Sequence, residues 1–221
     1  NAANSGGLGG GGVDGAVSKA GGKALYKTRE ALPIIPTQQL NPIDMASSST
    51  YADCRIPTGD CVMTGPNTYG TLKVGHVIHA VGPNYNSQSQ SQSLSQLDVC
   101  LSSAYRNSLT TAMEYGIELL GFSLLSAGVY RGDCSLEHVL KIAVETVIEG
   151  VWDGLREVHL VGYTDAEIDV LIELVRRIEV QTLSVGATTA TTTTSNGDCR
   201  TGCGYDMEID GFIESLTQQT L

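Results

Sequence analysis

Residues 1–22 read NAANSGGLGGGGVDGAVSKAGG, and this stretch decides both the fold and the candidate site. A glycine run ends at Gly12, and apolar residues at helical spacing follow it. Glycine lets the backbone approach a ligand closely, so peptide N–H groups can point at phosphate oxygens. The positive end of the following helix dipole adds to this attraction. A flexible linker is the alternative interpretation of the glycine run.

Two polar side chains flank the glycine run. Asn4 can both donate to and accept from sugar hydroxyls, and Asp14 is the one acid of this segment. The stretch therefore predicts a site for a ligand that is both phosphorylated and hydroxylated. Two structural roles stay open: Asn4 can brace the glycine loop, and Asp14 can simply favour the N-terminus of its helix.

Two later stretches complete a pattern. Residues 75–83 read GHVIHAVGP, and residues 123–132 read SLLSAGVYRG. With residues 1–22 they resemble, in order, three motifs of the macro domain, a module that binds ADP-ribose. The resemblance covers about residues 1–180.

The resemblance implies a set of site residues. Asn4 would position the distal ribose, and Asp14 would activate water or polarise a ribose hydroxyl. It implies no cofactor and no metal. It places the ligand between two loops, whose contacting residues are Gly11, Gly12 and Val13 in the first and Ser126, Ala127, Gly128, Val129 and Tyr130 in the second.

Two residues of the second loop depart from the family pattern. Ala127 stands where the family usually has threonine, and Arg131 stands where it usually has glycine. Arg131 can reach a phosphate, block the pocket or remain a solvated loop residue.

The resemblance also implies the fold class, a three-layer α/β/α arrangement with a mixed central sheet. In the family, strands precede the asparagine pair, and an aspartate in that earlier stretch contacts the adenine. The sequence begins at the asparagine pair, so either it is a fragment or these strands are supplied differently, and we assign no adenine contact.

The hydrophobic pattern predicts alternating elements. We expect a macro-like domain over residues 1–184, interrupted by a proline-containing loop insertion at about 30–60, and a threonine-rich linker with an acidic tail over 185–221. Short hairpin-like strands are expected at 58–64 and 69–72. The other expected elements are strands at 73–81, 117–125 and 157–163 and helices at 13–26, 94–115, 136–150 and 164–179.

Charge and cysteine content limit the function classes. The formal net charge of −11 argues against direct binding to nucleic acid or acidic membranes, which are held mainly by Lys and Arg. Six cysteines without zinc-ribbon spacing favour reduced thiols, with disulfides as the alternative. We expect an intracellular protein of the cytoplasm or nucleus, with an organelle as the alternative.

Three functions fit these observations. The first is hydrolysis at the distal ribose, by removal of mono-ADP-ribose from protein or by deacetylation of O-acetyl-ADP-ribose. The second is a reader that binds ADP-ribose or ADP-ribosylated protein without turnover. The third is a scaffold with a vacant pocket, whose insertion or tail binds a protein partner.

His76 and His79 invite a catalytic interpretation, but a hydrogen-bonded core histidine is the expected one.

Overall fold

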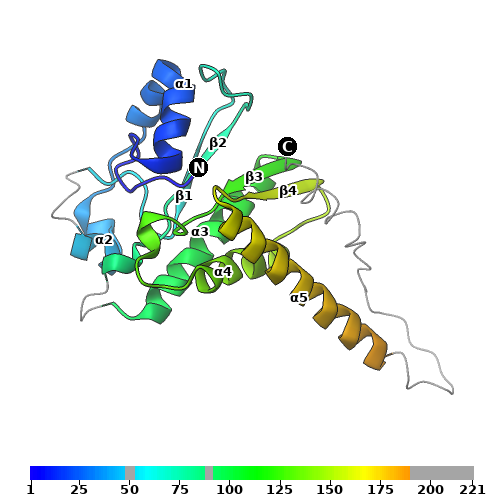
Figure 1. The fold of residues 1–221 in the computed structure, drawn as a ribbon. Helices are drawn as coiled ribbons and strands as arrows, with labels where there is room; N and C mark the ends of the chain where they lie inside the picture. The colour runs from blue at the N-terminus through cyan, green and yellow to red at the C-terminus, as the bar shows by residue number, and fades with distance from the viewer. Residues whose placement is uncertain (48–52, 88–91, 190–221) are drawn as a thin grey trace, which may run out of the picture.

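The computed structural model describes residues 1–47, 53–87 and 92–189. Its strands form two small sheets (Figure 1). In the first, β1 (Cys61–Thr64) pairs antiparallel with β2 (Val77–Ala80), with Cys61 opposite Ala80. In the second, β3 (Leu119–Ser123) pairs parallel with β4 (Glu157–Val161), with Leu119 opposite Glu157. The strands thus show both orientations expected of a mixed sheet.

The N-terminal residues lie between the two sheets. Ala2 forms a parallel bridge with Ala80 of β2, and Ala3 N–H donates to the Ala80 carbonyl at 2.8 Å. On the other side, Ala2 N–H donates to Ser123 Oγ at the end of β3, at 3.0 Å. Because Ala2 contacts both sheets, the two sheets are held as neighbouring parts of one layer.

Helices cover the first sheet on both faces (Figure 1). On one face, Val77 packs with Leu25 of α1 (Gly12–Glu30). On the other face, Ile78 and Ala80 belong to the main core with α3 (Leu94–Glu114). Successive strand residues point to opposite faces, so a single strand serves both helix layers. This arrangement is the three-layer α/β class predicted from the sequence.

The main core lies beneath the second sheet. Leu120 and Phe122 of β3 are buried against α3, α4 (Leu136–Glu149) and α5 (Asp165–Thr189). Tyr105 packs on Phe122 with ring centroids 5.4 Å apart. The C-terminal part of α5 projects away from the rest of the described chain (Figure 1).

Helix boundaries follow local capping. Ser93 and Gln96 form a reciprocal capping box at the start of α3, and Thr164 and Glu167 exchange the same pair of bonds before α5. Helix α5 extends past the predicted end at 179 and includes the first residues assigned to the linker. The rest of the predicted linker and tail, residues 190–221, lies outside the described residues.

Three expectations about strands and loops need correction. The strand expected at 73–81 covers only Val77–Ala80. Its partner β1 ends at Thr64, which lies opposite Val77, so the residues before Val77 have no partner in β1. Residues 69–72 form a turn instead of a strand, and Thr71 N–H donates to the Ala20 carbonyl of α1. The insertion contains a 3-10 helix (Thr37–Gln39) and the short helix α2 (Pro42–Ser47).

Within the described ranges, no helix is both long and apolar enough to cross a membrane. The cysteines that these ranges contain are free thiols, namely Cys54, Cys61, Cys100 and Cys134.

Candidate functional site

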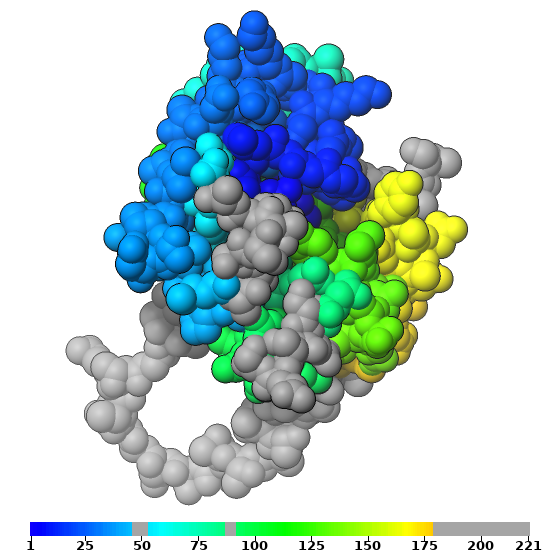
Figure 2. Space-filling view, turned by 90° about the vertical axis from the view of Figure 1, so that its left-hand side faces the viewer, coloured from blue at the N-terminus to red at the C-terminus, as the bar shows by residue number. Residues whose placement is uncertain are grey.

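Both candidate loops begin at the same edge of the strands. The first loop follows Ala3, which pairs with the last residue of β2, and the second follows Ser123, the last residue of β3. Ligand sites of open α/β sheets lie at such carboxyl ends. Figure 2 shows the N-terminal residues, in dark blue, on one face with green residues of the second half of the chain. The fold therefore brings the two sequence-predicted loops to one side of the molecule.

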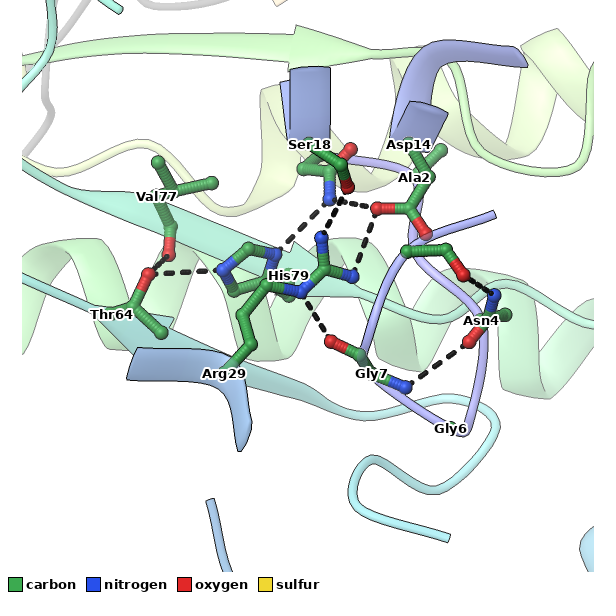
Figure 3. A network of polar contacts seen from close by, with 12 residues as sticks. Ala2, Asn4, Gly6, Gly7, Asp14, Ser18, Arg29, Thr64, Val77 and His79 are labelled. Atoms are coloured by element: carbon green, nitrogen blue, oxygen red, sulfur yellow. Dashed lines mark hydrogen bonds and ion pairs between the residues drawn. The ribbon is translucent and has the colours of Figure 1, made fainter. Parts of the chain in front are cut away.

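Asp14 of the first loop is buried and partly neutralised. Its side chain lies at the start of α1, 2% exposed. Its Oδ1 atom accepts from Asn1 Nδ2 at 2.9 Å and faces Arg29 Nη2 at 2.9 Å (Figure 3). Asp14 is therefore not the lone carboxylate that the sequence suggested, since Arg29 supplies a counter-charge from within the same helix.

The other carboxylate oxygen of Asp14, Oδ2, is buried and accepts no hydrogen bond from the described residues. It lies beneath Gly10, where an added Cβ would stand 3.3 Å from Oδ2 and 2.8 Å from Asn4 Nδ2. Any side chain at residue 10 would therefore crowd these two polar groups, so the position favours glycine. A buried acceptor without a partner costs about 1–3 kcal/mol, so a hydroxyl that donates to Oδ2 recovers that energy.

Asn4 braces the glycine loop in this structure. Its Nδ2 donates to the Gly9 carbonyl at 2.9 Å, and its Oδ1 accepts from Gly7 N–H at 3.1 Å. These two bonds match the bracing role that the sequence left open. The side chain is only half-buried and lies beside Asp14 under Gly10, so the same amide also borders the candidate ligand position.

A chain of polar residues supports Asp14 from below. Asn1 Nδ2 also contacts His79 Nδ1 at 3.1 Å, and His79 Nε2 contacts Thr64 Oγ1 at 3.0 Å (Figure 3). Because an amide N–H only donates, His79 Nδ1 acts as the acceptor and Nε2 carries the proton. Burial, and next the positive charge of Arg29, lower the pKa of His79 to about 3. For His79, the prediction of a hydrogen-bonded core histidine is confirmed.

The second loop is held by bonds to its backbone and by one strained residue. Tyr105 Oη accepts from Leu125 N–H at 2.8 Å, deep in the core. Ser126 has φ of 54°, in the left-handed region that residues other than glycine rarely adopt. Its Oγ donates to the Pro83 carbonyl at 2.7 Å. Backbone strain of this kind is often found where a ligand is held.

Arg131 stabilises its own loop. Its Nε donates to the Ala127 carbonyl at 3.2 Å and its Nη1 to the Cys134 carbonyl at 2.5 Å. Of the three roles left open by the sequence, that of a loop residue fits these contacts best. The guanidinium of Arg131 is bound to backbone carbonyls rather than solvated. Asn86 Nδ2 donates to the Val129 carbonyl at 2.6 Å and fixes the tip of the loop to the turn after β2.

Most of the remaining predicted ligand residues are exposed. In the first loop, Gly11, Gly12 and Val13 are exposed, and in the second, Gly128 and Val129 are exposed while Ala127 is buried and Tyr130 is half-buried. A Cβ added at Gly11, Gly12 or Gly128 would meet nothing within 4 Å. Backbone groups of both loops are thus accessible, as a phosphate-binding role requires.

Other titratable groups near the second loop bond to one another. His138 Nε2 contacts Asp98 Oδ1 at 2.9 Å, and Tyr85 Oη donates to the same oxygen at 2.8 Å. Burial raises the pKa of Cys134, the opposite of what an activated thiol needs. In the part of the chain that the structure describes, no group of three or more His, Cys, Asp and Glu could hold a metal ion.

Sequence reasoning did not find Arg29 among the site residues. Lys19, Lys23, Lys27 and Arg29 all follow Asp14 in the same helix, and spacing alone did not separate them. The break at Gly22 brings Arg29 to Asp14, because it changes the direction of the helix after its third turn. The Gly21–Gly22 pair is the available signal in the sequence, because adjacent glycines weaken a helix, but it does not give the new direction of the chain.

The comparisons with known proteins agree on one family. The Macro domain model matches residues 1–143. The chain is 37% identical over 173 residues to a macro domain-containing protein of Caldanaerobacter subterraneus, covering 77% of this chain and 82% of that one. It is 29% identical to O-acetyl-ADP-ribose deacetylase 1 of Pantoea vagans, covering 79% and 87%. A mutant of the Oceanobacillus iheyensis macrodomain solved with ADPR superposes with a TM-score of 0.61 at 25% identity, covering 80% of this chain and 83% of that one. This chain therefore belongs to the macro domain family.

Proposed function

We propose that this protein binds ADP-ribose between the Asn4–Asp14 loop and the Ser126–Gly132 loop. The carrying observation is Asp14 Oδ2, a buried acceptor without a partner among the described residues, which lies next to Gly10, a residue that has no side chain to cover it. A distal-ribose hydroxyl is a donor that suits this atom. The exposed backbone of both loops suits the diphosphate, and a mutant of the Oceanobacillus iheyensis macrodomain was solved with ADPR.

We further propose hydrolysis at the distal ribose, either removal of mono-ADP-ribose from protein or deacetylation of O-acetyl-ADP-ribose. The Pantoea vagans relatives named O-acetyl-ADP-ribose deacetylase support this activity. In the hydrolase, Asn4 positions the ribose, and the free Oδ2 of Asp14 polarises a hydroxyl or accepts a proton from water.

A second candidate function is a reader without turnover. The ion pair of Asp14 with Arg29 favours it, because the buried guanidinium holds the carboxylate in one place as a hydrogen-bond acceptor. The reader needs Oδ2 only as a fixed acceptor for the ribose.

Calorimetric titration with ADP-ribose tests the binding proposal. Gly128→Glu is a suitable variant because an added Cβ meets nothing within 4 Å there. Far-UV circular dichroism of the variant and the wild type establishes that both fold. We expect wild-type affinity near 1 μM, about −8 kcal/mol, and its loss when a carboxylate fills the phosphate position. Gly121→Glu, on the exposed side of β3 with equal room, is the matched control. Absence of wild-type binding would overturn both ligand functions and favour the scaffold.

A turnover assay separates hydrolase from reader. Release of ADP-ribose from a mono-ADP-ribosylated protein, and of acetate from O-acetyl-ADP-ribose, is measured for the wild type and for Asp14→Asn. Loss of turnover in the variant, with measurable binding retained, supports the hydrolase. A wild type that binds ADP-ribose but releases neither product is a reader.

A further inference from the structure

Arg29 is one of the largest fully buried side chains of the protein, only 1% exposed. It reaches the candidate site because helix α1 is broken at Gly22, where φ is 57° and ψ is −153°. This backbone conformation favours glycine, and it lets the last two turns of α1 bring Arg29 back under the first loop.

The guanidinium of Arg29 contacts three separate parts of the site (Figure 3). Nε donates to the Gly7 carbonyl of the glycine loop. Nη1 donates to Ser18 Oγ at 2.9 Å, and Nη2 faces Asp14 Oδ1 at 2.9 Å. A planar guanidinium holds such partners in fixed directions, which a lysine ammonium does not.

These contacts determine how both candidate ribose-binding side chains are presented. Arg29 and Asn1 occupy Oδ1 of Asp14 together, which leaves Oδ2 as the oxygen beneath Gly10. Gly7, whose carbonyl Arg29 holds, donates its N–H to Asn4 Oδ1 at 3.1 Å. Arg29 therefore acts on Asp14 directly and on Asn4 through Gly7.

We propose that Arg29 is a positioning residue for the distal ribose: it fixes Asp14 and Asn4 in the orientation that receives the ribose hydroxyls before the ligand arrives. A group held in its bound orientation loses less freedom on binding. This inference rests on the proposed binding of ADP-ribose. It assigns Arg29 to recognition of the ribose and not of the ADP portion.

The test compares the affinities of two ligands, ADP-ribose and ADP, which lacks the distal ribose. Calorimetry gives both dissociation constants for the wild type, Arg29→Lys and Arg29→Gln, below the unfolding temperature of each variant. We expect Arg29→Gln to lower the preference for ADP-ribose about tenfold, the effect of one lost hydrogen bond, and to change ADP affinity less than about twofold. Arg29→Lys keeps the charge and part of the reach, so it should recover part of the preference.

Arg106→Gln is the matched control, because Arg106 lies on the exposed surface of α3 and pairs only loosely with Glu149 at 3.7 Å. It should leave both affinities unchanged.

A merely structural Arg29 gives a different result. If Arg29→Gln weakens ADP-ribose and ADP equally, or leaves the preference intact, the inference is wrong. If Arg29→Gln does not fold, Arg29→Lys decides, and failure of both variants to fold also overturns the positioning role. Failure of the wild type to bind either ligand refutes the proposed function itself and is thus a separate outcome.

Discussion

The two candidate ligand loops lie at the same edge of the strands but are stabilised in different ways. The first loop, residues 4–14, rests on buried charged and polar side chains centred on Asp14 and Arg29. The second, residues 124–132, is held by bonds between side chains and its backbone carbonyls or N–H groups. Because a buried ion pair is costly to break, the first loop should depend far more on single side chains than the second.

The largest effect is expected in the first loop. Asp14→Ala leaves Arg29 buried without its counter-charge, so the free energy of unfolding should fall by about 3–5 kcal/mol. Urea unfolding measures this loss. Glu149→Ala removes an ion pair of the exposed surface and should change stability by less than about 1 kcal/mol. Equal losses in the two variants would show that the buried pair is unimportant.

The corresponding change in the second loop should be smaller. Tyr105→Phe removes the bond to Leu125 N–H and leaves a buried donor without its partner, at a cost of about 1–3 kcal/mol. Tyr115→Phe, at an exposed tyrosine, is the control. A Tyr105→Phe variant as destabilised as Asp14→Ala would contradict the contrast between the loops.

The supporting histidine of the first loop predicts a pH effect. The pKa of His79 is lowered to about 3 by burial, whereas in the unfolded chain it is about 6.5. The unfolded state therefore binds the proton more readily, and the stability contributed above pH 6.5 is lost as the pH falls toward 3. Between pH 7.5 and 5.5 this group should account for about 1.4 kcal/mol.

Unfolding curves of the wild type and His79→Gln at these two pH values check the effect of His79. The variant should lose less stability on acidification than the wild type. Identical pH dependence of the two proteins would show that His79 is protonated in the folded state or does not contribute.

The smallest effect is expected at the tip of the second loop. Asn86→Ala removes the hydrogen bond from Asn86 Nδ2 to the Val129 carbonyl. Because Asn86 is exposed, water can replace this bond. We expect a loss of stability of about 0.5–1.5 kcal/mol at most. Hydrogen exchange of the amides of residues 128–132 should nevertheless rise, and unchanged exchange would mean that this loop is fixed by Ser126 and Arg131 alone.

The sequence predicted those parts of the fold that depend on local pattern. Helices 94–115 and 136–150 and the strands at 117–125 and 157–163 lie within a few residues of the observed elements, because their apolar periodicity and caps are local signals. The reach of β2 was overestimated, since strand length depends on the partner strand and not on the strand's own residues.

The candidate site was only partly predictable for a similar reason. The motifs named the loops, but they did not show that Asp14 pairs with Arg29 or that Asn4 bonds Gly7 and Gly9. These contacts depend on the backbone at Gly22, where the sequence indicated a weakened helix but not its new direction. Asn1, His79 and Thr64 come from distant segments, and only the folded chain brings them into one network.

The role of Asp14 Oδ2 in binding the distal ribose is tested most directly by the ratio of ADP-ribose to ADP affinity in Asp14→Asn and in the wild type. The variant keeps the shape of the side chain and an oxygen for Asn1 and Arg29, but it replaces the free acceptor under Gly10 by a donor. We predict that the wild type prefers ADP-ribose and that the variant loses about tenfold of that preference with ADP affinity unchanged. An unchanged preference would contradict the claim that Asp14 Oδ2 receives the distal ribose.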